Sequence, residues 1–236
     1  MIEWKSNALV HAKDQAPKES VGLLINVKGK ERYFPCKNLS TSASETFVLD
    51  PKDYIRANET GEILAVIHSH PMTSPTPSQA DKISCEHSGL PWYIVNPKTE
   101  EWGYLKPSGY KAPLLGRQWV WGVTDCYSLV RDWYKQERNI ELRDYERSMN
   151  PEEFSEDPLF ESYAWRTGFR ELRYGEQLKK GDLLLMSIMS PNLNHVGIFL
   201  GDMVLHHLTG RLSCREPYSE WLLKCTGKRY RYAQNS

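Results

Sequence analysis

The stretch Val66-Ile-His-Ser-His-Pro-Met-Thr-Ser-Pro-Thr-Pro-Ser-Gln-Ala-Asp81 decides the fold of the first half of the chain. The branched apolar run 63–67, which overlaps its start, predicts a buried strand. His68 and His70 leave this run at positions i and i+2, so both rings point to the same face. Three prolines then favour a stiff loop, and Ser78 begins a predicted helix in which Asp81 lies one turn from the start.

Two imidazoles and one carboxylate in this arrangement can bind zinc at three positions. A zinc ion with three protein ligands keeps its fourth position open for water, which is typical of a catalytic site and not of a structural one. A simpler interpretation needs no metal, because Ser78-x-x-Asp81 is close to a capping box. The spacing therefore predicts His68, His70 and Asp81 as zinc ligands, with helix capping as the alternative.

The same residues resemble the signature of an enzyme family. His68-Ser-His70-Pro, followed by Ser78 and Asp81 at this spacing, is similar to the full JAMM motif of the zinc isopeptidases. That family also carries a glutamate on its first helix, just before a Gly-Leu-Leu strand, and Glu19 is the matching residue. The resemblance covers residues 1–106. It implies that Glu19 is the general base and that the Ser78 hydroxyl stabilises an oxyanion.

The composition excludes several classes of partner. The 236 residues carry 30 acidic and 30 basic side chains, so bulk charge indicates neither a nucleic acid nor an anionic membrane as partner. No apolar run has transmembrane length, and the N-terminus lacks the apolar core of a secretory signal. Five cysteines without a Cys-x-x-Cys pair argue against a disulfide framework and a zinc ribbon, and favour folding in a reducing cytoplasm.

The order of elements in the first half predicts an α/β domain. A helix over residues 2–16 would bury Ile2, Leu9, Ala12 and Ala16, and Pro17 would end it. The other expected elements are strands over 21–27, 31–35, 47–49, 63–68, 92–95 and 101–105, and helices over 51–59 and 78–87.

Residues 106–113, Lys-Pro-Ser-Gly-Tyr-Lys-Ala-Pro, form the clearest linker in the chain. They are rich in breakers and have no apolar period. We therefore expect two domains, 1–108 and 109–236, each long enough to bury a core.

A second centre follows the linker. Asp125-Cys126 leads into a run in which Leu129, Val130 and Trp133 form an apolar helix stripe, so Cys126 is expected at a helix N-terminus with Asp125 as its cap. Unpaired amides and the helix dipole there favour a thiolate. The alternative is a small buried residue on an amphipathic helix, which is the commoner role of a cysteine.

The remainder of the second half predicts an α+β domain. A helix is expected around 151–165, and strands are expected after the turn at Gly181-Asp182, over 194–201 and over 203–208. Cys126 on a helix start and His195 on a later strand are the elements of a Cys–His nucleophile pair. A third polar group would fix the imidazole.

These elements resemble the NlpC-type cysteine peptidases, papain-like enzymes that cut the peptide stems of the bacterial cell wall. The resemblance covers residues 113–225 and rests on Trp-Gly…Asp-Cys126, Gly-Asp-Leu, Asn-His195-Val-Gly and a following histidine. It implies Cys126 as nucleophile, His195 as base and a third residue on the next strand. The family's usual spacing selects His207, and His206 stays open because one residue in the hairpin turn decides between them. The family's Asp-Cys-Ser-Gly is Asp-Cys-Tyr-Ser here, which keeps the nucleophile and leaves the family's substrate pocket open to question.

A JAMM-type domain followed by an NlpC-type domain resembles the tail-tip assembly proteins of lambda-like phages. The resemblance implies a zinc amidohydrolase site and a cell-wall endopeptidase site in one tail-tip component, made in the host cytoplasm and acting at the periplasm or cell wall. Its expected cofactor is zinc. Its expected partners are other tail-tip proteins and, as substrate, peptidoglycan peptides. Two alternatives are degenerate domains that only bind tail proteins, and a cellular deubiquitinase-like enzyme, which the second domain disfavours.

Overall fold

The chain forms two compact units, residues 1–111 and 112–236, in a computed structural model that describes residues 2–145 and 159–233. The linker composition placed the boundary after Ser108. In the structure the Glu86 carboxylate, on helix α3 (Gln79–Ser88), accepts hydrogen bonds of 2.6–3.1 Å from the backbone amides of Ser108, Gly109 and Tyr110. These bonds hold the first part of the linker on the first unit.

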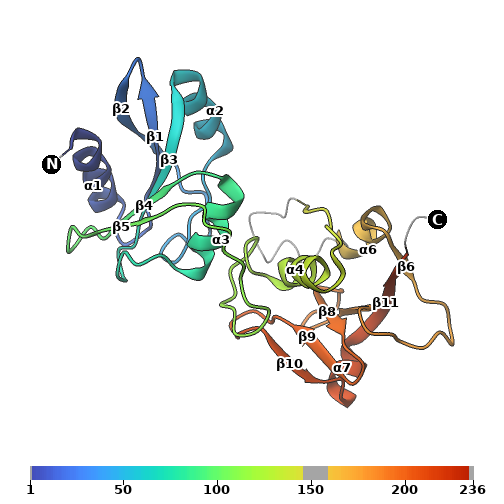
Figure 1. The fold of residues 1–236 in the computed structure, drawn as a ribbon. Helices are drawn as coiled ribbons and strands as arrows, with labels where there is room; N and C mark the ends of the chain where they lie inside the picture. Colours follow the sequence, from blue (N-terminus) through green and yellow to red (C-terminus); the bar gives the residue numbers. More distant parts are fainter. Residues whose placement is uncertain (1, 146–158, 234–236) are drawn as a thin grey trace. The chain divides into compact units, whose positions relative to one another are not determined.

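The first unit is a five-stranded sheet with helices on both faces (Figure 1). Its strand order is β2-β1-β3-β4-β5, and only the β3–β4 pair is parallel. Along β1, alternation sends Leu24 towards Trp4 of α1, and Leu23 towards Ala57 of α2 and Cys85 of α3. The bounds are α1 (Glu3–Gln15), β1 (Val21–Val27), β2 (Lys30–Cys36), α2 (Pro51–Thr60), β3 (Glu62–Ser69), β4 (Trp92–Val95) and β5 (Trp102–Leu105).

Local sequence signals account for several of these elements. Lys28 and Gly29 have positive φ angles of 51° and 81° in the two-residue turn between β1 and β2, as a primed hairpin turn requires. Asp50 caps α2, because its side chain accepts a hydrogen bond of 2.9 Å from the Lys52 amide. The expected β1, β4 and α2 are therefore confirmed to within one residue.

Two details of the first unit correct the sequence expectation. The strand expected over 47–49 is a single bridge between Asn38 and Leu49, because the Asn38 side chain accepts from the Val48 amide in place of a second strand. Ile2 and Ala16 are exposed, because they are the residues that flank α1 at its two ends. The buried stripe of α1 consists of Trp4, Ala8, Leu9 and Ala12.

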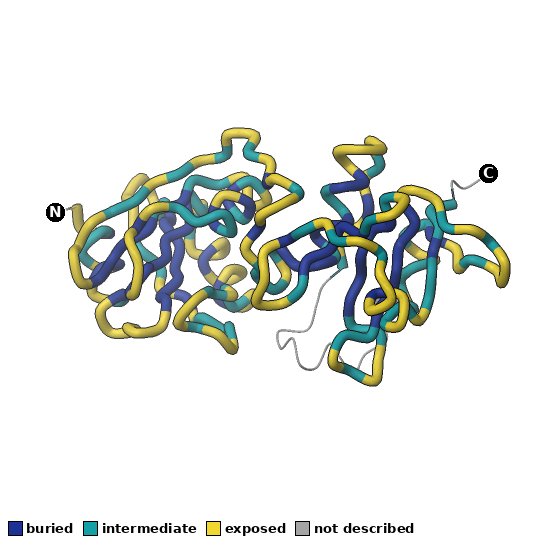
Figure 2. The backbone as a smooth tube through the Cα atoms, turned by 90° about the horizontal axis from the view of Figure 1, so that it is seen from below, coloured by how far each residue is buried: buried dark blue, intermediate teal, exposed yellow. Residues whose placement is uncertain are grey.

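The second unit is a six-stranded antiparallel sheet in the order β10-β9-β8-β7-β11-β6 (Figure 1). Helix α4 (Cys126–Arg138) packs Leu129 and Trp133 with Val196, while Leu222 of α7 packs with Met186 in a separate cluster. Figure 2 shows buried stretches of backbone inside each unit and exposed stretches around them. The bounds are β6 (Phe169–Glu171), β7 (Leu183–Met186), β8 (His195–Phe199), β9 (Met203–His206), β10 (Cys214–Pro217), α7 (Glu220–Cys225) and β11 (Thr226–Tyr232).

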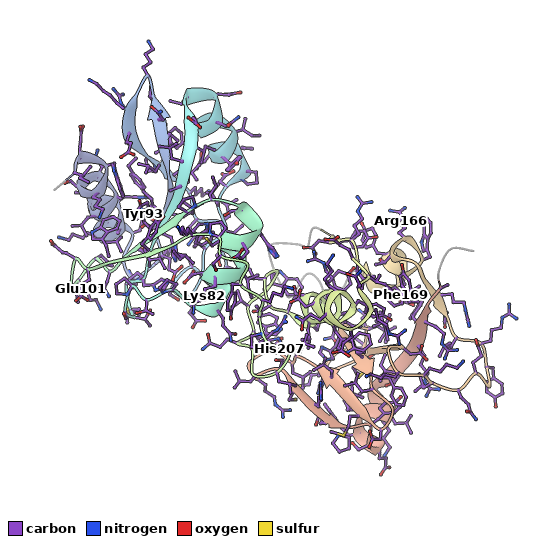
Figure 3. All side chains as sticks on the ribbon, viewed as in Figure 1. Lys82, Tyr93, Glu101, Arg166, Phe169 and His207 are labelled. Carbon is purple, nitrogen blue, oxygen red and sulfur yellow. The ribbon has the colours of Figure 1, made fainter. Side chains whose placement is uncertain are left out.

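The second unit contains more elements than the sequence predicted. The three expected strands are present as β7, β8 and β9. Residues 151–158 of the helix expected over 151–165 lie outside the described residues, and the rest forms α6 (Leu159–Ala164) and the 3-10 helix η1 (Trp165–Thr167). The unexpected β6 is a short charged strand without alternation, anchored by Phe169 (labelled in Figure 3), whose ring lies 5.4 Å from that of Tyr134.

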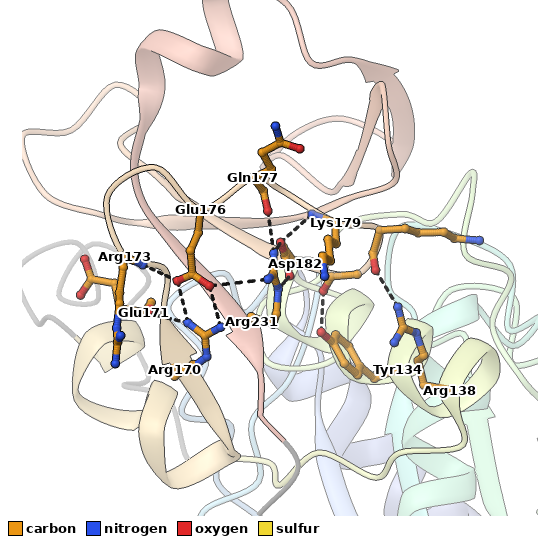
Figure 4. A network of polar contacts seen from close by, with 12 residues as sticks. Tyr134, Arg138, Arg170, Glu171, Arg173, Glu176, Gln177, Lys179, Asp182 and Arg231 are labelled. Atoms are coloured by element: carbon orange, nitrogen blue, oxygen red, sulfur yellow. Dashed lines mark hydrogen bonds and ion pairs between the residues drawn. The ribbon is translucent and has the colours of Figure 1, made fainter.

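A polar network joins β6 and β11 to the turn before β7 (Figure 4). Glu176 accepts hydrogen bonds of 2.8 and 2.9 Å from Arg170. Arg231 donates bonds of 2.7 and 2.9 Å to Asp182. The bonds from Arg170 hold the pKa of Glu176 at about 2, so this carboxylate stays ionised at neutral pH and keeps the edge of the sheet attached.

Arg117 fixes the start of the second unit. Its side chain is fully buried, donates to the carbonyls of Ala112, at 3.0 Å, and Pro113, and pairs with Asp132 of α4 at 2.6 Å. A buried guanidinium needs partners for its donors, so residues 112–113 are held on this unit. Among the described helices, none combines the length and apolarity that crossing a bilayer requires.

Candidate active sites

The first candidate site lies at the end of β3, the central strand of the first sheet. His68 is paired on both sides, to β1 and to β4. His70 follows the strand, and its amide donates to the Val95 carbonyl at 2.9 Å. Its Nδ1 lies 2.9 Å from the Ser74 carbonyl. Because a carbonyl only accepts, this Nδ1 carries the proton and Nε2 keeps a lone pair for a ligand.

The structure brings the three expected zinc ligands together. The Nε2 atoms of His68 and His70 are 3.1 Å apart and lie 3.2 and 3.3 Å from the two carboxylate oxygens of Asp81. Zinc–ligand bonds of roughly 2.0–2.1 Å in a tetrahedron give ligand-to-ligand distances of about 3.3 Å. All three side chains are buried. The donor set and its spacing therefore fit zinc with one position left open.

Asp81 serves helix α3 and this cluster at once. Ser78 Oγ accepts from the Asp81 amide at 3.1 Å, and Asp81 Oδ2 accepts from the Ser78 amide at 2.7 Å, which is a complete capping box. Burial acts to raise the pKa of Asp81, but hydrogen bonds and charge from His68 and His70 outweigh it and hold that pKa well below its usual range. Helix capping and metal binding are thus compatible roles of one ionised carboxylate.

Glu19 does not lie on a helix, which corrects the sequence expectation. Pro17 follows the end of α1, and Glu19 lies in the segment that leads into β1. This segment is attached to the end of β3, because the Ser20 amide donates to Ser69 Oγ at 2.8 Å. Burial raises the pKa of Glu19, while the charges of His68 and His70 oppose the shift. Glu19 is therefore a buried carboxyl within the electrostatic reach of the cluster.

A pocket of about 450 Å³ opens beside this cluster. Glu19 and His70 line it, together with Pro17, residues 44–45 and residues 71–73. A substrate in this pocket would meet the candidate base and one candidate ligand together. The pocket walls come from three segments, and the sequence did not indicate that residues 44–45 contribute to them.

Two aromatic rings that the sequence did not single out enclose His68. Its ring centroid lies 4.9 Å from that of Phe47 and 5.4 Å from that of Trp92. The Nδ1 atom of His68 is buried and has no hydrogen-bond partner within the described part of the chain. Packing therefore orients the Nδ1 side of this ring, while Nε2 faces His70 and Asp81. No sequence signal links Phe47 or Trp92 to His68 until the pairing of β3 with β4 is known.

The second candidate site begins with Cys126, the first residue of α4, as the sequence predicted. Asp125 caps the helix, since its Oδ1 accepts from the Ser128 amide at 2.8 Å. Cys126 is buried in the same cluster as Val196, the neighbour of His195, and α4 packs on β8. The two expected catalytic residues therefore begin two elements that pack together.

His206, and not His207, lies against His195. Nε2 of His195 is 3.1 Å from Nδ1 of His206, eleven positions along the chain. The short turn after β8 pairs Gly197 with His206, and this pairing turns the His206 side chain to the face of His195. The preference for His207 is therefore corrected, because it assumed a turn one residue longer.

His207 points away from this pair. Its ring is fully buried, and Nε2 lies 3.1 Å from the Arg211 carbonyl. Figure 3 shows His207 beside the loop that leads into α4, and backbone groups of Arg117 and Thr124 from that loop act on its ring. His207 therefore packs between the hairpin and this loop.

Glu216 on β10 extends the histidine pair, and sequence reasoning missed it. Its Oε1 lies 2.5 Å from Nε2 of His206. The alignment His195–His206–Glu216 resembles the way an acidic or amide group orients a catalytic imidazole. The sequence carried no signal for Glu216, because β10 itself shows no apolar alternation.

Burial sets the charge of this histidine pair. Burial lowers the pKa of His195 to about 3, and the nearby charges of His206 and His207 add to the shift. Burial also lowers the pKa of His206, against the opposing charge of Glu216. The resting pair is therefore neutral and offers no positive charge to a thiolate at Cys126. The lowered pKa also makes His195 a weaker base than an exposed histidine. The helix N-terminus still favours the thiolate that the sequence predicted.

Comparisons with known proteins cover both units. Residues 2–105 match the prokaryotic homologs of the JAB domain, and residues 116–230 match the NlpC/P60 family. The chain is 38% identical to the tail tip assembly protein K of Escherichia phage N15 over 231 residues, which make up 95% of this chain and 92% of that protein. It is 35% identical to the tail tip assembly protein K of Escherichia phage lambda over 173 residues, 73% of this chain and 83% of that protein. A probable TtuB-protein conjugate cleaving protease of Thermus thermophilus is 34% identical over 110 residues, 44% of this chain and 73% of that protein.

Proposed function

The chain belongs to the family of the phage tail tip assembly protein K, and on this premise we propose that it works in tail-tip assembly and carries one hydrolytic site in each unit. It would be made in the host cytoplasm, join other tail-tip proteins and act on the host cell wall. The convergence of His68, His70 and Asp81 beside Glu19 is the observation that carries the hydrolase assignment.

In the first unit, His68, His70 and Asp81 would hold zinc, which polarises an amide carbonyl and makes water a stronger nucleophile. Glu19 would accept a proton from the attacking water and pass it to the leaving amine. The raised pKa of Glu19 makes it a stronger base for this transfer. The reaction class is hydrolysis of an amide or isopeptide bond, which the similarity to a conjugate-cleaving protease supports.

The Ser78 hydroxyl would contribute to the same reaction. As the cap of α3, its oxygen accepts one hydrogen bond and leaves the hydroxyl hydrogen available. That hydrogen can be donated to the oxyanion that forms when the carbonyl is attacked. Because the capping box fixes Ser78 beside Asp81, this donor is oriented before a substrate binds.

In the second unit, the sulfur of Cys126 would attack the carbonyl carbon of a peptide bond in a peptidoglycan stem. His195 would take the thiol proton on Nδ1, because its Nε2 faces His206, and would give that proton to the departing amine. Water then hydrolyses the thioester with the same imidazole as base. His206 and Glu216 would orient the ring of His195 throughout.

The test is to incubate the purified full chain with peptidoglycan fragments and, separately, with isopeptide-linked conjugates, and to identify new termini by mass spectrometry. Cys126→Ser should abolish stem cleavage and leave conjugate cleavage intact. Glu19→Gln should do the reverse. Each variant is the control for the other, because they alter different units. A wild-type protein that produces no new termini either with zinc bound or after removal of metal would reject both activities.

The burial of Cys126 and His195 favours a second candidate function, in which the second unit only binds tail proteins. A domain whose nucleophile is buried can keep its fold and have no catalytic turnover. Here the wild-type protein and Cys126→Ser would support tail assembly equally and neither would release stem peptides. A stem-cleaving wild-type protein rules this function out for the second unit.

A further inference from the structure

Strands β9 and β10 place three possible metal ligands on one face of the second sheet. Cys214 lies directly opposite His206, and Glu216 is two residues further along the same strand, so all three side chains share that face. One atom of each lies within 4.8 Å of the other two: a histidine nitrogen, a thiol sulfur and a carboxylate oxygen. His206 is buried, whereas Cys214 and Glu216 are half-buried and reachable from solvent.

We propose that His206, Cys214 and Glu216 form a second metal site, for zinc or a similar borderline-soft divalent cation. Imidazole nitrogen, thiolate and carboxylate are the three ligand types that zinc takes in proteins, and three ligands leave a fourth position for water. Nε2 of His206 already lies 2.5 Å from Glu216, so a bound ion replaces this hydrogen bond with two bonds to the metal. The thiol of Cys214 gives up its proton to solvent on binding.

This site would control the thiol site through the position of two protons. Without metal, Nε2–H of His206 donates to Glu216, its Nδ1 accepts from Nε2–H of His195, and Nδ1 of His195 is left to accept a proton. A metal on Nε2 of His206 takes that lone pair, so the single proton of His206 moves to Nδ1 and is donated to His195. The proton of His195 must then sit on Nδ1, the nitrogen that has to be free for the thiol.

The metal-loaded second unit is therefore silent, and removal of the ion switches it on. This consequence rests on the proposed thiol site, but the metal site itself does not. A soft-metal site beside the histidine pair would keep the hydrolase off where the metal is plentiful and release it where the metal is scarce.

Cobalt substitution tests the site independently of any activity. Co²⁺ bound to a thiolate gives a near-ultraviolet charge-transfer band, and the cluster of His68, His70 and Asp81 contains no sulfur. Titration of the metal-free full chain with Co²⁺ should produce this band in the wild type, in His70→Ala and in the control Cys225→Ser. The band should be absent in Cys214→Ser. Glu216→Gln should weaken Co²⁺ affinity by more than the roughly 10–100-fold that loss of an outer-shell partner costs.

The site would be overturned by the absence of a charge-transfer band in the wild type, or by a band that persists in Cys214→Ser. A band lost in Cys126→Ser instead would also overturn it, by moving the metal to the candidate nucleophile. The proton shift has its own readout in nitrogen-15 spectra of the histidine rings. Zinc should move the His195 proton from Nε2 to Nδ1 in the wild type and not in Cys214→Ser. If the proton stays on Nε2 in both proteins, the proposed control of the thiol site is wrong, but the metal site is not affected.

Discussion

Gly197 on β8 lies directly opposite His206 on β9. A Cβ at position 197 would come within 3.3 Å of the His206 Cβ and within 2.7 Å of the Val204 side chain. Glycine therefore allows the close approach that brings His206 to His195. The pairing of the strands, and not the residue count along the chain, selects the histidine that joins the site.

Separate alanine substitutions of His206 and His207 distinguish a residue that orients His195 from one that only packs in the core. His206→Ala should lower kcat for stem cleavage by roughly 10²–10⁴-fold, because His195 loses the group that orients its ring. His207→Ala should leave kcat of the folded protein within a few-fold and lower the urea midpoint, because it empties a buried position. Kinetics and urea unfolding of both variants give the answer, and the opposite pattern would restore His207 to the site.

The first unit should hold about one tightly bound zinc per chain. The measurement is best made in the Cys214→Ser background, so that β9 and β10 contribute no metal. There, His70→Ala should lose the zinc after removal of loosely bound metal, and His87→Ala, an exposed histidine on α3, should keep it. Elemental analysis decides, and zinc retained in His70→Ala would contradict the ligand assignment.

Glu19→Gln should retain zinc and lose conjugate cleavage by roughly 10²–10⁴-fold, because an amide cannot accept the proton of the attacking water. Glu45→Gln is the matched control, since Glu45 lines the same pocket and has no assigned role in the chemistry. Loss of zinc along with activity would make Glu19 a ligand or a structural residue.

Zinc affinity should also depend on a residue that touches no ligand. A Cβ at Gly103 of β5 would lie 1.9 Å from the Pro75 carbonyl, so Gly103→Ala must displace the loop whose Ser74 carbonyl holds His70. We expect a loss of roughly 10-fold or more in zinc affinity, as for other groups that orient a ligand. Gly89→Ala, which strains the positive φ of 66° after α3 and meets no neighbour, should reduce stability without this loss. Competition with a chelator measures the zinc affinity of both variants. If Gly103→Ala binds zinc as tightly as Gly89→Ala, the loop can move without disturbing His70.

The second unit should lose stability as the pH falls below about 6.5. His195, His206 and His207 all have pKa values lowered mainly by burial, so they stay neutral in the fold while unfolded histidines become charged. The unfolded state then binds more protons, and the free energy of unfolding decreases by up to about 1.4 kcal/mol per pH unit for each such histidine. For His195 this range extends down to a pH of about 3. Calorimetry of the full chain between about pH 7.5 and 5.5 should show this loss of stability. His207→Gln should reduce the slope of stability against pH, and a stability that does not change with pH would refute the prediction.

The sequence predicted the elements of the first unit and the convergence of its three candidate ligands well because the information there is local. A strand end, a proline-rich loop and a helix cap bring His68, His70 and Asp81 together within one short stretch. It failed where strand pairing carries the information. Glu216 and the choice of His206 both depend on the register of β8, β9 and β10. Glu19 was expected on a helix from the family resemblance alone, although Pro17 already predicted that the helix ends before it.

Two sets of hydrogen bonds hold the linker, one from Glu86 and one from Arg117, and they affect how readily a protease can cut it. A segment rich in proline, glycine and lysine between two domains is ordinarily the first place to be cut. Here Glu86 holds the amides of residues 108–110, and buried Arg117 holds the carbonyls of residues 112–113. A protease needs several consecutive residues free to enter its cleft in extended form, and the span between the two sets of hydrogen bonds is too short to supply them. Trypsin should therefore spare Lys111 in the folded protein, and Glu86→Ala, which frees one side of the span, should expose it to cleavage.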